Sequence, residues 1–196
     1  MSLLACFILP ASGGSEMTFV ARKRRAPPPV RRRRTSPRVD IVVASPLWTA
    51  QRSLKVLLRR AIREAASMVS TIQGQRSELA IVLTDDTAIR ALNRDWRSKD
   101  ATTNVLSFPA KDPRHARGTT HLLGDIVIAY ETTEREARAE HKPFAHHLAH
   151  LAVHGFLHLA GYDHATDDEA AAMEKLETAI LARLDVPDPY IARSAV

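Results

Sequence analysis

Three histidines in one short segment are the residues of this chain best suited to chemistry. His154, His158 and His164 lie in the run His-Gly-Phe-Leu-His-Leu-Ala-Gly-Tyr-Asp-His. Residues four apart lie one above the other on a helix, so His154 and His158 can direct ring nitrogens at one metal ion. Gly161 can adopt the left-handed conformation that ends many helices, and the chain would then turn back to bring in His164. The pattern predicts one Zn²⁺ per chain, held by these three histidines.

The number of ligands indicates what kind of metal site this is. A structural zinc is usually closed by four Cys or His ligands, whereas three ligands leave a position for water or substrate. The only cysteine is Cys6, far from the histidines in sequence. The alternative is that the histidines are ordinary polar residues on a half-exposed helix. Seven of the nine histidines fall between His141 and His164, which favours the metal site.

The same spacing occurs in the zinc-protease motif HExxHxxGxxH, where the residue after the first histidine is the glutamate general base. In this chain that residue is Gly155. A metallopeptidase of that type would lack its base, so peptide hydrolysis is the weaker interpretation of this metal site.

Positive charge is concentrated at the N-terminus. Residues 1–38 contain nine Lys or Arg and one acidic residue, a net charge of +8, while the remaining 19 basic and 21 acidic residues give −2. Residues 22–34, which are rich in arginine and proline, have almost nothing to bury, so residues 1–38 are predicted to be a disordered basic tail, and residues 39–196 a single domain. The tail is interpreted either as an arm that neutralises RNA phosphates or as a solvated tail without a partner.

Other features of the sequence indicate the cellular compartment of the protein. A single cysteine allows no disulfide within the chain, which is typical of a reducing compartment. The apolar stretch at residues 3–9 has no basic residue before it, unlike a secretory signal. No apolar run is long enough to span a bilayer. We expect a cytoplasmic protein without a membrane partner.

The elements that would position the histidines follow from the apolar pattern. Short β-branched runs predict strands, and apolar residues at helical spacing predict helices. Asp85 is expected to cap a short helix, and Thr166 with Glu169 forms a capping box for the last one. Strands are predicted at residues 39–43, 79–83, 105–108 and 122–129, and helices at residues 54–69, after Asp85, from Glu131, behind Pro143 and after Thr166. Strands gathered early and helices late predict an α+β fold, a small mixed four-stranded sheet packed with helices around a zincin-like metal site.

Several motifs together give the chain a specific resemblance. The run from Leu92 to Asp100, Leu-Asn-Arg-Asp-Trp-Arg-Ser-Lys-Asp, leads through two threonines into Asn-Val-Leu-Ser-Phe-Pro. With the Leu-Gly-Asp-Ile-Val-Ile segment and the histidine block, this resembles the YbeY family of bacterial metallo-endoribonucleases. The similarity runs from about Val39 to Tyr190 and excludes the tail.

The resemblance implies a zinc-dependent, single-strand-specific endoribonuclease acting in 3′ end maturation of small-subunit ribosomal RNA and in ribosome quality control. Its implied partners are single-stranded ribosomal RNA and the ribosome or its small subunit, with no DNA expected. The implied zinc ligands are His154, His158 and His164. The alternative hypothesis is a non-catalytic, zinc-stabilised ribosome-assembly factor that binds RNA.

Arg97 is the catalytic residue that the resemblance implies. A guanidinium offers a planar fork of donors to a phosphate and keeps its charge, so it can offset charge in a transition state. The sequence alone instead favours a surface salt bridge to Asp95 or Asp100.

Two further residues near the histidines have more modest expected roles. His150 shares a helix face with His154 and is expected to pack or to orient a ligand, although it could also be a reserve ligand. Asp163 is interpreted either as a carboxylate that orients an imidazole or as a cap for the following turn.

Overall fold

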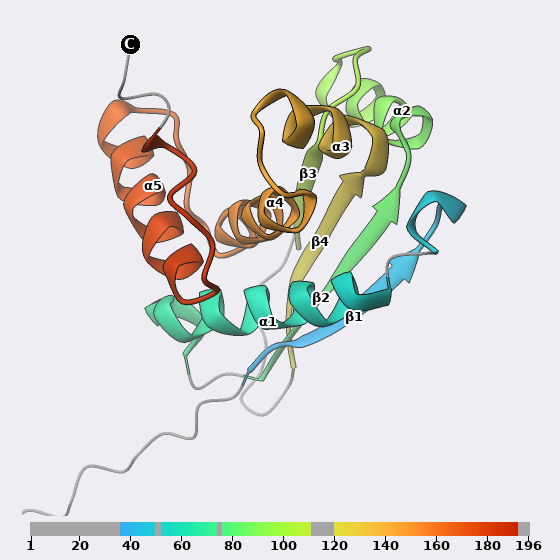
Figure 1. Ribbon diagram of the computed structural model, residues 1–196. Helices are drawn as coiled ribbons and strands as arrows, with labels where there is room; N and C mark the ends of the chain where they lie inside the picture. The colour runs from blue at the N-terminus through green and yellow to red at the C-terminus, as the bar shows by residue number, and fades with distance from the viewer. Residues whose placement is uncertain (1–35, 50–51, 74–75, 111–119, 192–196) are drawn as a thin grey trace, which may run out of the picture. The chain divides into compact units, whose positions relative to one another are not determined.

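The computed structural model describes residues 36–49, 52–73, 76–110 and 120–191. Its elements follow in the order β1 (Arg38–Val43), η1 (Pro46–Trp48), α1 (Arg52–Met68), η2 (Ser70–Ile72), β2 (Ser77–Thr84), α2 (Asp86–Arg97), β3 (Val105–Pro109), β4 (His121–Ala129), α3 (Tyr130–Ala139), α4 (Phe144–Leu159) and α5 (Asp167–Ala182) (Figure 1). The predicted α+β class is therefore confirmed.

The four strands form one mixed sheet in the order β1-β2-β4-β3. β1 and β4 both run parallel to β2, whereas β3 runs antiparallel to β4 at the edge. Gly124 has a φ of +129°, and a Cβ there would collide with the carbonyl oxygen of Phe108. The register between β2 and β4 shifts beside it, so Gly124 lies at an irregularity within a continuous strand.

Alternating side chains give the sheet two different apolar faces. On β4, Ile126 and Ile128 join the large core formed with α1, α4 and α5, while Val127 joins a smaller cluster with Ile89 of α2. This alternation follows from the two-residue period of a strand. It places α2 and α4 on opposite faces of the sheet.

Helix α4 is the central element of the larger core. Most of its side chains are buried, and it contacts α1, α3, α5, β3 and β4. Figure 1 shows α4 between the sheet and α5. A helix that is apolar on most sides is typical of such a buried position, and its histidines are the polar exceptions.

Most predicted elements are found within one or two residues of the expected positions. Asp85 caps α2 through Ala88 N, and Thr166 with Glu169 forms the predicted capping box of α5. Pro143 is the N-cap of α4 and not part of its first turn.

One predicted segment, the basic tail up to residue 35, falls outside the described residues. In the part of the chain that the structure describes, no helix has the length and apolar character needed to cross a bilayer.

Candidate functional site

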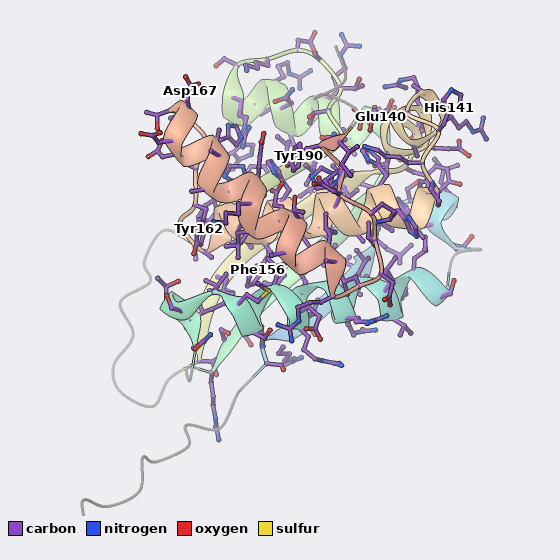
Figure 2. All side chains as sticks on the ribbon, turned by 60° about the vertical axis from the view of Figure 1, so that its left-hand side comes forward. Glu140, His141, Phe156, Tyr162, Asp167 and Tyr190 are labelled. Carbon is purple, nitrogen blue, oxygen red and sulfur yellow. The ribbon has the colours of Figure 1, made fainter. Side chains whose placement is uncertain are left out.

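The end of α4 determines how the histidine segment folds. The helix closes with a Schellman motif, in which Gly161 N donates to His158 O and Tyr162 N donates to Leu157 O. Gly161 has the predicted left-handed φ, +91°. The turn sends the chain away from α4 toward the start of α5, and Figure 2 labels both ends of this connection, Tyr162 and Asp167.

This turn brings the three predicted histidines together. One ring nitrogen from each of His154, His158 and His164 lies within 4.8 Å of the others, and no other such group of three metal-binding side chains occurs among the described residues. His154 and His158 are half-buried and His164 is exposed. Two half-buried ligands and one exposed ligand leave the group open to solvent on one side.

The hydrogen bonds of the two helix histidines prepare them to bind a cation. His158 Nδ1 lies 3.0 Å from the carbonyl oxygen of Tyr162, and His154 Nδ1 lies 2.8 Å from Glu177 Oε1. Both acceptors require the Nδ1 atoms to donate, which leaves the lone pair of a neutral ring on Nε2. The two Nε2 atoms face each other at 3.1 Å. Tetrahedral zinc ligands would lie roughly 3.3 Å apart, so these residues fit a metal ion.

Electrostatics favours the neutral form of His158. Burial lowers the pKa of this imidazole, and the nearby His154 and His164 lower it further. A neutral ring is the form that can coordinate a metal.

A substitution at the turn tests how the third histidine is positioned. A Cβ on Gly161 would meet no atom within 4 Å, so the cost of Gly161→Ala comes from its left-handed backbone alone. We expect a loss of about 1–2 kcal/mol in the free energy of unfolding, measured by urea denaturation, together with weaker metal binding because His164 follows the turn. Gly161→Asn, which tolerates this conformation better, is expected to lose less. Full stability in Gly161→Ala would contradict the role given to the turn.

An open cavity of about 680 Å³ lies beside the histidines. His154 and His164 line one part of it, and α5 contributes Glu174 and Glu177. Tyr190, in the segment after α5, lines it as well. The segment with Tyr190 runs back along α5 (Figures 1 and 2). The cavity provides space for a ligand next to the histidine group.

Glu177 is an important site residue that the sequence analysis missed. Its carboxylate is completely buried and contacts His150 and Tyr190 as well as His154. Burial alone would raise the pKa of Glu177, but hydrogen bonds from His150, His154 and Tyr190 outweigh it and lower the pKa to about 2. In the sequence, Glu177 lies between Met173 and Ile180 on the apolar face of α5. This position could have indicated a buried acid.

His150 therefore supports the three-histidine group without being one of its members. Its Nε2 lies 3.3 Å from Glu177 Oε2 and 3.3 Å from the Tyr190 hydroxyl. Asp163 accepts from the backbone N–H of His164 at 2.8 Å, so of its two interpretations the structure favours the local turn.

A second acid–histidine pair lies in another part of the cavity. His147 Nε2 contacts Glu136 Oε2 at 2.9 Å, and Asn104 Nδ2 donates to the same oxygen at 2.8 Å. Burial raises the pKa of Glu136, but these two hydrogen bonds and the charge of nearby groups lower it overall. Together with Asn104, the pair connects α3 and α4 to the start of β3.

Packing explains why glycine follows His154. A Cβ on Gly155 would lie 2.9 Å from Ile126 Cγ2 and 3.1 Å from Ser107 Oγ. This side of α4 is pressed against the sheet, so a glutamate at the position of the protease general base would have to displace the side chains of Ile126 and Ser107. The structure thus gives a physical reason against the metallopeptidase interpretation.

No hydrogen bond or ion pair among the described residues joins Arg97 to the three histidines. It is exposed at the end of α2, on the other face of the sheet from α4. The expected salt bridges to Asp95 and Asp100 are absent from the described residues, because Arg94 pairs with Asp95 and Arg90 with Asp100. Arg97 itself forms no ion pair within the described ranges.

Comparisons with known proteins identify the family of this chain. The family model described as Endoribonuclease YbeY matches residues 46–185. A protein named Endoribonuclease YbeY from Nitrobacter hamburgensis is 55% identical over 157 residues, 79% of this chain and 82% of its own. A protein of that name from Rhodopseudomonas palustris is 51% identical over 166 residues, 82% and 85% of the two chains.

A more distant likeness is to a solved structure, the solution structure of TM1509 from Thermotoga maritima. It is 22% identical, with a TM-score of 0.45 over 75% of this chain and 91% of that chain, which is too distant to bear on the site. The family model and the relatives cover most of the chain at high identity. This chain belongs to the endoribonuclease YbeY family.

Proposed function

We propose that this chain is a zinc-dependent endoribonuclease that cleaves single-stranded ribosomal RNA, in 3′ end maturation of the small-subunit RNA and in ribosome quality control. The names of its relatives support an endoribonuclease. The observation that carries the metal dependence is the pair of Nε2 atoms of His154 and His158, which face each other at 3.1 Å while both Nδ1 atoms are engaged elsewhere.

The proposed ligands of one zinc ion are His154, His158 and His164. When bound, zinc supplies positive charge that acidifies water and polarises a phosphoryl oxygen, and both effects favour phosphodiester cleavage. The three imidazoles are neutral donors and leave that charge uncompensated. Gly155 supplies no carboxylate, so the chemistry does not use the general base of the zinc proteases.

Arg97 is proposed to hold an RNA phosphate. Its guanidinium is exposed and unpaired among the described residues, so its donors are available. The segment after it leads to Asn104, which precedes the edge strand β3 and lines the cavity. An RNA strand that follows this edge could contact both the arginine and the histidine group.

The remaining assignments rest on the sequence and on the proposed substrate. The domain is proposed to span residues 39–196, with the basic residues 1–38 adding salt-sensitive contacts to RNA phosphates. The proposed partners are the ribosome or its small subunit, and the proposed compartment is the cytoplasm.

Metal removal tests the proposal directly. Dialysis against a chelator is expected to reduce cleavage of a single-stranded ribosomal RNA fragment to background while far-UV circular dichroism stays near that of the untreated protein. Added Zn²⁺ should restore cleavage, and a duplex of the same sequence should be cut poorly. A 2′,3′-cyclic phosphate on the product would identify the RNA 2′-hydroxyl as the nucleophile.

The alternative of a non-catalytic assembly factor predicts a different pattern. Its zinc would chiefly stabilise the fold, so the chelated protein would unfold and the metal-loaded protein would not cleave RNA. That pair of results would replace the endoribonuclease proposal.

A further inference from the structure

Glu177 is a buried charged residue beside the larger apolar core. It lies on α5, and its side chain is 1% exposed. Burying a carboxylate is unfavourable unless hydrogen bonds and charges compensate it. Glu174 is one turn away on the same helix and lines the same cavity, yet it makes no hydrogen bond among the described residues. The buried position and the contacts of Glu177 therefore indicate a specific role in the site.

The contacts of Glu177 divide between its two oxygens. Oε1 lies 2.8 Å from His154 Nδ1. Oε2 accepts a hydrogen bond from the Tyr190 hydroxyl and lies 3.3 Å from His150 Nε2. With one oxygen held by Tyr190 and His150, the other has a fixed direction toward His154.

This arrangement determines the tautomer of His154. An ionised carboxylate only accepts hydrogen bonds, so Nδ1 must carry the proton of a neutral ring, which leaves the Nε2 lone pair free. That atom faces His158 Nε2. A carboxylate behind a metal-binding histidine also raises the basicity of the ring and fixes its plane.

We propose that Glu177 is a positioning residue that holds His154 as the Nδ1–H tautomer with Nε2 directed at the metal, and that Tyr190 holds Glu177 in place. This inference rests on the proposed metal function of His154. It assigns a role to the segment after α5, which is tied to the domain by Thr178 Oγ1 to Asp188 Oδ1 at 3.3 Å and by Lys142 Nζ to Pro189 O at 3.1 Å.

The experiment reads the tautomer and the metal affinity separately, without RNA. Long-range ¹H–¹⁵N spectra of the metal-free protein report which nitrogen of His154 is protonated. Competition with a chelator gives the Zn²⁺ affinity. The variants are Glu177→Met, which fills the space without an acceptor, and Glu177→Gln, which keeps an acceptor but removes the charge. Glu174→Gln is the matched control on the same helix.

We expect the wild type and Glu174→Gln to show the Nδ1–H tautomer of His154 and equal Zn²⁺ affinity. In Glu177→Met the tautomer should shift toward Nε2–H and the affinity should fall about 10- to 100-fold. Glu177→Gln should lose roughly three- to tenfold, because a neutral amide accepts more weakly. This second variant preserves the shape of the side chain if Glu177→Met does not fold.

Two results would overturn the inference. One is an Nε2–H tautomer in the wild type, and the other is a Zn²⁺ affinity within twofold of the wild type in Glu177→Gln. Failure of the proposed function would look different, because the wild type would then not bind Zn²⁺ or cleave RNA although the tautomer of His154 was as expected.

Discussion

Replacing His158 with alanine is expected to remove both Zn²⁺ binding and RNA cleavage. The substitution deletes one of three ligands and leaves His154 Nε2 without its facing partner at 3.1 Å. We expect the affinity to fall by more than about 100-fold, beyond the range for residues that only orient a ligand, and cleavage to fall to background. The lost hydrogen bond to the Tyr162 carbonyl should cost about 1 kcal/mol of stability. Chelator competition, RNA cleavage and urea denaturation measure the three effects.

The matched control is His146→Ala, on the same helix but outside the three-histidine group. It is expected to keep Zn²⁺ affinity and cleavage. A His158→Ala protein that cleaved RNA at the wild-type rate without zinc would contradict the metal mechanism.

Arg97→Ala is expected to leave zinc binding unchanged and to slow cleavage by up to roughly 10²–10³-fold, the cost of removing one donor to a transition-state charge. The physical reason is that a guanidinium donates two hydrogen bonds to a phosphate and stays charged. Folding should be little affected, because Arg97 is exposed and unpaired among the described residues. Single-turnover cleavage by metal-loaded protein measures the effect.

Arg94→Ala is the matched control, because it also removes one positive charge from α2. Arg94 lies in the same last turn of α2 but pairs with Asp95 at 2.9 Å. We expect at most a small change in cleavage. Equal rates for the wild type and Arg97→Ala would remove Arg97 from the mechanism, whatever the status of the metal site.

Local chemistry explains why much of the fold could be predicted from the sequence. The caps at Asp85 and Thr166 use a side chain and the backbone a few residues away, so the sequence alone contains both partners. The turn at Gly161 is equally local. The three histidines come together because a helix face and one turn fix their relative positions.

Residues whose partners are distant in sequence could not be found in this way. Glu177 meets His154 across 23 positions, and Tyr190 reaches His150 across 40. Such contacts depend on how α4 and α5 pack, which periodicity does not specify. For the same reason the sequence predicted neither the strand order nor that α2, with Arg97, covers the opposite face of the sheet from α4.

The most direct test is cleavage of a single-stranded fragment from the 3′ end of small-subunit ribosomal RNA by the purified, zinc-loaded protein. It is run beside a His154→Ala variant prepared identically and a chelated sample of the wild type. We predict cleavage by the zinc-loaded wild type alone. Equal cleavage in all three samples would contradict the assignment of the nuclease activity to this histidine site.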